Sequence, residues 1–227
     1  MINIEKNLIA PDQWDNIERI FEQTTPADGK STAGLNIQHL KQSSIYNNDC
    51  SYSAIFTKEV KDRLNKLLHG FYQANTRFSS YKKGDFYGWH VDSQHTNRHG
   101  GCNSVAYTCF LSNPSEYEGG ELEIDTEAGI HRIKLNKGDM VVYPAYYLHR
   151  VRKIKKGIRK VCVGWIRSHF PDPKDRFTLT RIEKVATIIN DLYLALEKGE
   201  EKKAMLEAYT QMHFIRTQFQ RKCYNNL

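Results

Sequence analysis

The stretch "GDFYGWHVDSQH", residues 84–95, is the most informative part of this sequence. It ends an aromatic, strand-like run on an imidazole and a carboxylate, His90 and Asp92, held one residue apart. The end of a strand is a usual place for a site in a β-barrel. A chain with nine histidines and 26 acidic residues also produces such pairs by chance. The pair therefore predicts a metal site only if further ligands are found elsewhere.

Short segments on both sides of this stretch have the composition of β-strands. Some are rich in aromatic and β-branched residues, and others alternate between polar and apolar residues. Turns that contain glycine, such as Gly119-Gly120, separate them. This pattern predicts a mainly β fold with flanking helices, in which a double-stranded β-helix (jelly roll) forms the core. The expected strands cover residues 71–81, 104–112, 119–125, 129–135, 138–144 and 159–166.

Helical periodicity appears only at the two ends of the chain. Trp14, Ile17 and Phe21 recur at helical spacing in residues 10–24, and a second helix is expected over 57–70. We expect residues 1–70 to pack on the core, 71–170 to form that core, and 171–227 to form a helical extension of one compact unit.

The extension is predicted to be a C-terminal helical hairpin, because two apolar stripes flank Gly199. These stripes could bury against the barrel, which is the favoured interpretation, or form a homodimer with a second subunit. The first stripe contains Ile182, Val185, Ile189, Leu192 and Leu196, and the second contains Met205, Tyr209, Met212, Ile215 and Phe219.

Composition narrows the class of protein. Hydrophobic residues make up 40% and charged residues 26%, which is ordinary for a soluble globular chain. No apolar run approaches the roughly 20 residues of a membrane span, and the N-terminus lacks the features of a signal peptide. The five cysteines are odd in number and none forms a CxxC pair. We therefore expect a cytoplasmic protein with reduced thiols and no membrane partner.

The net charge of +7 is concentrated in "HRVRKIKKGIRK", residues 149–160. Such a basic strip can attract nucleic acid or an acidic partner. It can equally form a solvated hairpin, which is the favoured interpretation.

The same strip contains the expected remainder of the metal site. His149 follows "GDMVVYPAYYL", and Arg159 comes ten residues later, beyond a Lys156-Gly157 turn. A hairpin of that length would place both residues on neighbouring strands, facing the barrel interior. Two imidazoles and one carboxylate form the facial triad of non-haem Fe(II) oxygenases. A guanidinium would hold the far carboxylate of a 2-oxo acid cosubstrate.

Several segments together resemble the bacterial PKHD-type hydroxylases, within the Fe(II)/2-oxoglutarate dioxygenase superfamily. These segments agree with that family in their residues, their order and their spacing. They are "ADGKSTAGLN", "YKKGDFYGWHVD", "FLSNPSEYEGGELEI", "HRIKLNKGDMVVYPAYYLHRV" and "GIRKVCVGWIRS". The resemblance implies a jelly roll that uses Fe(II) and 2-oxoglutarate, with ascorbate as reductant. It implies His90, Asp92 and His149 as iron ligands and Arg159 as the partner of the distal 2-oxoglutarate carboxylate.

The resemblance also suggests further residues of the pocket. Tyr81 is expected near the cosubstrate, Trp165 in the pocket wall, and Thr108 as a second carboxylate contact. Tyr87 is expected to face the substrate. His95 is a candidate substrate contact in the polar segment 93–103, which is predicted to be a loop that closes over substrate.

The expected function is a dioxygenase that hydroxylates an aliphatic C–H bond and releases succinate and carbon dioxide. The substrate would be a prolyl or lysyl residue of a protein or peptide, or an amino-acid-like small molecule. One alternative directs the same chemistry to nucleic acid through residues 150–160. Position 165 argues against it, because nucleic-acid demethylases of this superfamily have a second arginine there and this chain has Trp165. A binding module without turnover is disfavoured, because all the expected ligands are present.

Overall fold

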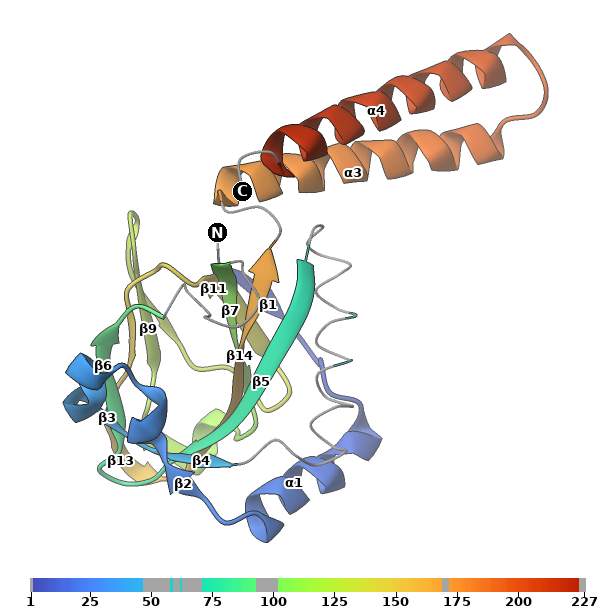
Figure 1. Cartoon of the computed structure of the whole chain (residues 1–227). Helices are drawn as coiled ribbons and strands as arrows, with labels where there is room; N and C mark the ends of the chain where they lie inside the picture. The colour runs from blue at the N-terminus through green and yellow to red at the C-terminus, as the bar shows by residue number, and fades with distance from the viewer. Residues whose placement is uncertain are drawn as a thin grey trace. The chain divides into compact units, whose positions relative to one another are not determined.

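The computed structural model describes residues 2–46, 58, 62, 71–92, 102–168 and 172–224. The chain forms two compact units (Figure 1). The first unit, Met1–Arg63 with Gln73–Arg167, carries the sheets, and the second, Leu64–Tyr72 with Ser168–Leu227, carries the C-terminal helices. Of the helix predicted over 57–70, only Lys58 and Asp62 are described, and both are helical. The rest of that prediction lies outside the described residues.

The first unit is built on two β-sheets. The larger sheet has the order β1-β11-β7-β14-β5-β4-β2, and the smaller has the order β10-β9-β12-β6-β3. The larger comprises β1 (Asn3–Glu5), β11 (Met140–Pro144), β7 (Cys102–Phe110), β14 (Arg159–Ser168), β5 (Phe71–Tyr81), β4 (Ser44–Tyr46) and β2 (Ala27–Asp28). The smaller comprises β10 (Gly129–Ile133), β9 (Leu122–Thr126), β12 (His149–Val151), β6 (Phe86–His90) and β3 (Lys41–Gln42).

A separate ribbon pairs β13 (Ile154–Gly157) with β8 (Tyr117–Gly119). Four short 3₁₀ helices lie in the connections that the structure describes: η1 (Pro11–Gln13), η2 (Gly29–Thr32), η3 (Leu35–Leu40) and η4 (Pro114–Glu116). The mainly β, double-sheet fold predicted from the glycine-bounded strands is confirmed.

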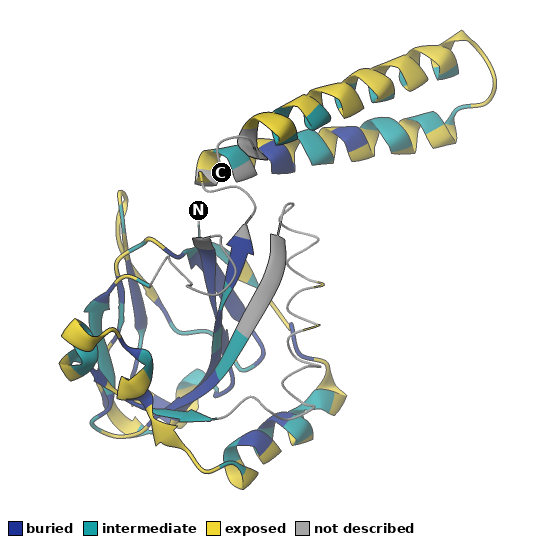
Figure 2. Ribbon diagram, in the orientation of Figure 1, coloured by how far each residue is buried: buried dark blue, intermediate teal, exposed yellow. Residues whose placement is uncertain are grey.

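The core lies between the two sheets, because alternate residues of each strand point inward. Phe110 and Val141 of the larger sheet pack with Leu122 and Ile124 of the smaller one, and each is 2% exposed or less. Figure 2 shows this buried layer along β7 and β14. A second cluster, which includes Tyr81, Val151 and Val161, closes one end of the sandwich.

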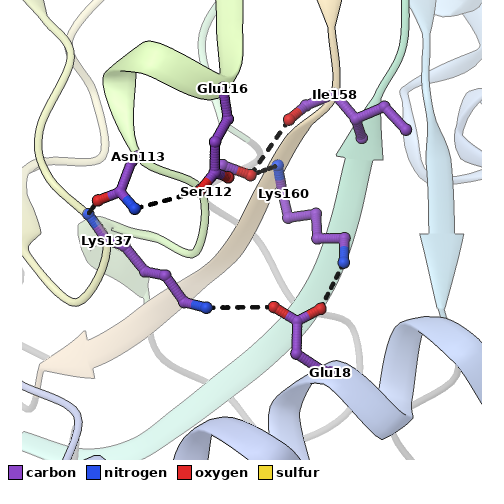
Figure 3. A network of polar contacts seen from close by, with 7 residues as sticks. All are labelled: Glu18, Ser112, Asn113, Glu116, Lys137, Ile158 and Lys160. Atoms are coloured by element: carbon purple, nitrogen blue, oxygen red, sulfur yellow. Dashed lines mark hydrogen bonds and ion pairs between the residues drawn. The ribbon is translucent and has the colours of Figure 1, made fainter.

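Helix α1 (Trp14–Gln23) follows η1, as the sequence predicts, and buries Ile17 and Ile20. Glu18 of this helix points toward the sheet, and its carboxylate accepts hydrogen bonds from Lys137 (3.2 Å) and Lys160 (2.5 Å) (Figure 3). Burial alone would raise the pKa of Glu18, but the two ammonium groups more than offset this and lower it. This network therefore ties the helix to the sheet only while Glu18 is ionised.

Replacing Glu18 by glutamine is expected to lower the free energy of unfolding by about 1 kcal/mol at pH 7, since the pairs are partly exposed and screened. A carboxylate with a lowered folded-state pKa stabilises above its unfolded pKa, near 4.5, and the contribution is lost as pH falls through that range. Urea unfolding at pH 7 and below pH 4 measures both effects. An equal loss of stability at both pH values would contradict the assignment to charge.

The second unit contains α3 (Pro173–Ala195) and α4 (Glu200–Tyr224), as the predicted hairpin requires. The side chain of Asp172 caps the start of α3 by accepting a hydrogen bond from the backbone N–H of Lys174. Among the helices that the structure describes, none has the length and apolar character to cross a bilayer.

Three residues of the predicted apolar stripes are exposed in the single chain, and their burial against a second surface stays a prediction. Val185, Leu192 and Ile215 are 42%, 49% and 49% exposed. The face that α3 turns toward α4 is instead centred on Leu179 and Ala186, 1% and 8% exposed, and Phe219 of α4 packs against Leu179. Figure 2 shows the remaining surfaces of both helices as largely exposed.

Candidate active site

Three metal-ligating side chains meet inside the first unit. His90 ends β6, His149 begins β12, and the two residues are paired directly across the antiparallel ladder. Asp92 lies two residues beyond the end of β6. One ligand atom from each of the three lies within 4.8 Å of the others. The Nε2 atoms of His90 and His149 are 3.9 and 3.7 Å from the carboxylate oxygens of Asp92.

The backbone fixes which nitrogen of each histidine can bind a metal. Nδ1 of His90 is 2.8 Å from the carbonyl oxygen of Gly88, and Nδ1 of His149 is 2.9 Å from that of Tyr147. A carbonyl oxygen only accepts hydrogen bonds, so Nδ1 must carry the proton in each ring. Both Nε2 lone pairs are then available beside Asp92, and a backbone partner of this kind orients a metal ligand.

Burial shifts the pKa values of two of the three ligand candidates, His90 and Asp92. Burial and the neighbouring His149 lower the pKa of His90 to about 3, so its imidazole is neutral at physiological pH. Burial raises the pKa of Asp92, with His149 and the Trp165 indole acting in the opposite direction. The ring of Tyr87 stacks on His90 with centroids 3.5 Å apart and holds it in place. Two neutral imidazoles and one carboxylate are the donor set that fits Fe(II).

Arg159, the first residue of β14, lines the same pocket and is 1% exposed. Its guanidinium carbon is 5.3 Å from the ring centroids of both Tyr81 and Phe110. Gly120 makes room for it, because a Cβ there would lie 3.1 Å from Cδ of Arg159.

Among the described residues, Arg159 has no anionic partner, so its guanidinium is available to bind an anion. Its Nε has no hydrogen-bond partner, and no carboxylate lies within salt-bridge distance of it, in the part of the chain that the structure describes. A buried guanidinium without a counter-ion is costly. The carboxylate of a bound cosubstrate such as 2-oxoglutarate would satisfy it, so the pocket fits that group.

The predicted hairpin between His149 and Arg159 is wrong. Residues 154–157 form β13, which pairs with β8, and β12 pairs with β6 and β9 of the smaller sheet. Arg159 instead begins β14 in the larger sheet. The two residues face one pocket from opposite sheets, because the intervening ribbon carries the chain from one sheet to the other.

The other residues predicted for the pocket fall into two groups. Tyr81, Tyr87, Thr108 and Trp165 all line it. Thr108 also shares a hydrogen bond with Tyr143. Burial raises the pKa of Tyr143, and this hydrogen bond lowers that pKa in part. His95 and almost all of the 93–103 segment lie outside the described residues.

The pocket residues that the sequence reasoning missed include two cations. Lys41 of β3 and Arg77 of β5 line the pocket together with the metal-ligand candidates. Strand alternation could have found Arg77, because it shares a face with Tyr81 four residues later. The two-residue strand that carries Lys41 offers no such signal.

The basic strip at residues 149–160 is largely paired with acids on the surface of the first unit. Arg150 and Arg132 donate from Nε to the buried carboxylate of Glu123 at 2.6 and 2.9 Å. Lys155 lies 3.3 Å from Glu118. This pairing leaves less free positive charge for nucleic acid than the sequence suggests.

The jelly roll, the His-Asp-His cluster and the buried arginine define the class of iron- and 2-oxoglutarate-dependent oxygenases. The family model of the 2OG-Fe(II) oxygenase superfamily matches residues 76–167. A PKHD-type hydroxylase of the cyanobacterium Prochlorococcus marinus is 36% identical over 217 residues, covering 91% of this chain and 87% of that protein. The chain belongs to the PKHD-type hydroxylases of the 2OG-Fe(II) oxygenase superfamily and is an Fe(II)- and 2-oxoglutarate-dependent dioxygenase.

A second relative carries the same family name, and solved structures of other proteins have a similar fold. The PKHD-type hydroxylase YbiX of Escherichia coli O157:H7 is 29% identical and covers 89% of this chain and 92% of its own length. A prolyl-4-hydroxylase from Pseudomonas putida has a similar fold, with a TM-score of 0.55, 18% identity, and 74% and 92% of the two chains covered. HygX of Streptomyces hygroscopicus, crystallised with nickel, 2-oxoglutarate and hygromycin B, gives 0.56 at 10% identity, covering 74% and 82%.

Proposed function

We propose that this dioxygenase hydroxylates an aliphatic C–H bond of a prolyl or lysyl residue in a protein or peptide, or of an amino-acid-like small molecule. The observation that carries the proposal is the convergence of His90, Asp92 and His149 beside the buried Arg159. The prolyl-4-hydroxylase among proteins of similar fold supports a peptide-type substrate. The pairing of Arg150 and Lys155 with glutamates favours this over the nucleic-acid alternative.

Iron and 2-oxoglutarate, when bound, supply the oxygen activation and the C–H oxidation, with release of succinate and carbon dioxide. The protein provides the metal ligands, through His90, Asp92 and His149, and their orientation. Arg159 anchors the distal carboxylate of the cosubstrate, with Tyr81 and Thr108 nearby. Trp165 forms part of the pocket wall, and Tyr87 faces the substrate.

Succinate formation tests the proposal directly. Purified protein is expected to release succinate in a reaction that requires both Fe(II) and 2-oxoglutarate and is stimulated by short prolyl- or lysyl-containing peptides. Mass spectrometry should then find a gain of one oxygen atom in the peptide. Omitting ascorbate tests its expected role as reductant and should slow repeated turnover. Stimulation by single-stranded DNA or RNA, and not by any peptide or amino acid, would favour the nucleic-acid alternative.

A further inference from the structure

The pocket is lined by two cations, the buried Lys41 and the partly buried Arg77, that neither the metal site nor the anchor for 2-oxoglutarate uses. Lys41 is 6% exposed, and its ammonium donates one hydrogen bond, to Oγ1 of Thr32 at 2.8 Å. It also lies 4.5 Å from the ring centroid of Tyr87, the residue stacked on His90. The guanidinium of Arg77 lies 5.2 Å from the ring centroid of Trp165. Both side chains therefore border the metal-ligand candidates.

In the part of the chain that the structure describes, neither cation has a close anionic partner. The ion pairs within 4 Å among the described residues include neither Lys41 nor Arg77. The two are near enough to repel each other: burial first, and then the charge of Arg77, lower the pKa of Lys41 to about 8, against opposing effects of Asp92 and Asp28. At pH 7 the ammonium is still mostly charged. Like charges held together under partial burial are costly unless an anion joins them.

Along the strands, the backbone position of Arg77 lies apart from that of Arg159. Arg159 sits over the ring of Tyr81, and Arg77 precedes Tyr81 by four residues on β5. Four residues of extended strand span roughly 13 Å. Arg159 and Trp165 are likewise separated by six residues of β14, or roughly 20 Å. A single 2-oxoglutarate anchored at Arg159 therefore leaves the Lys41 and Arg77 end of the pocket for another group.

The charges of the loaded site lead to the same conclusion. The two positive charges of Fe(II) are cancelled by the two negative charges of 2-oxoglutarate. Asp92 then offsets only one of the three pocket cations, Arg159, Lys41 and Arg77. The loaded pocket therefore keeps an excess of positive charge.

We propose that Lys41 and Arg77 form a carboxylate-binding subsite that selects substrates with a carboxylate close to the carbon that is oxidised. This inference rests on the proposed function and specifies the class of its substrate. The carboxylate has two sources: the α-carboxylate of a free amino acid or chain terminus, or the side chain of an acidic residue next to the target residue. The positions of Lys41 and Arg77 call for a negatively charged carboxylate, and either source would supply it.

Binding to the Mn(II) form tests the subsite without turnover. Wild-type protein with Mn(II) and saturating 2-oxoglutarate is titrated calorimetrically with two matched probe pairs. N-acetyl-L-proline and its carboxamide differ in an α-carboxylate, and acetyl-prolyl-glutamate amide and acetyl-prolyl-glutamine amide differ in a side-chain carboxylate. We expect the charged member of at least one pair to bind tenfold or more tightly than its neutral partner, and the responding pair identifies the source.

Variants of Lys41 and Arg77 then test whether these two residues cause the preference for the charged probe. Lys41→Met and Arg77→Met are each expected to weaken binding of the charged probe by about tenfold, to leave the neutral probe unchanged, and to alter 2-oxoglutarate affinity by less than twofold. Lys155→Met, which removes an exposed lysine on β13, is the matched control and should change neither. Each pocket variant removes a positive charge that has no ion-pair partner among the described residues, so thermal unfolding should show folded protein.

Failure of this inference is distinguishable from failure of the proposed function. If wild-type protein binds Mn(II) and 2-oxoglutarate but binds charged and neutral probes equally in both pairs, the subsite is refuted and the iron site stands. Loss of 2-oxoglutarate affinity in Lys41→Met or Arg77→Met also refutes it, because the cations would then serve the cosubstrate. Absence of Mn(II)-dependent 2-oxoglutarate binding would instead count against the iron-site assignment itself.

Discussion

Replacing Asp92 by alanine is expected to lower succinate formation by about a thousandfold or more, because a metal ligand contributes several kcal/mol to the reaction and each 1.36 kcal/mol is a factor of ten. Asp92 is the only carboxylate in the His90–Asp92–His149 cluster. Without it, two neutral imidazoles remain, and Fe(II) should bind far more weakly. Isothermal titration with Mn(II) and a succinate assay at saturating iron measure the two effects separately.

Stability distinguishes a lost ligand from a lost fold. Burial raises the pKa of Asp92, so its ionised form is disfavoured in the folded, metal-free protein. Such a group reduces stability above its unfolded pKa, so removing it should not lower the free energy of unfolding at pH 7. Asp125→Ala, on the exposed side of β9, is the matched control and should retain full turnover. An Asp92→Ala protein with normal turnover would refute the assigned ligand set.

The parts of this site that the sequence predicts are those with a local signal. His90 and Asp92 stand together at the end of an aromatic strand, and His149 begins a strand of its own. Once the strands are placed in two facing sheets, the ladder brings these residues together without further information. The strand assignments succeeded for the same reason, since alternation and glycine-bounded turns are local properties.

The errors arose where the arrangement depends on contacts far apart in the chain. Sequence spacing made a hairpin between His149 and Arg159 reasonable, but β13 pairs with β8 and separates them into different sheets. Lys41 was missed because a two-residue strand has no periodicity, and only its pairing with Tyr87 places it at the pocket.

Replacing Arg159 by methionine is expected to raise the KM for 2-oxoglutarate by about a hundredfold, the effect of losing a bidentate, charge-assisted pair. Arg159→Lys keeps the charge but not the planar fork, and should fall between wild type and Arg159→Met. The affinity for Mn(II) should stay within twofold of wild type, because Arg159 is not among the three ligand candidates. Succinate assays at varied 2-oxoglutarate give the KM, and titration of the Mn(II) form gives the binding constant.

Lys160→Met is the matched control for this series. Lys160 is the next residue of β14, so its side chain points to the opposite face, where it pairs with Glu18. Its loss should cost a little stability and leave the KM for 2-oxoglutarate unchanged. Arg159→Met, in contrast, removes a buried cation with no carboxylate partner among the described residues, and should not lower the free energy of unfolding. If Arg159→Met instead raised only the KM of the hydroxylated substrate, the anchor for 2-oxoglutarate would have to be sought among the other pocket cations. The carboxylate subsite at Lys41 and Arg77 would then need to be reassigned with it.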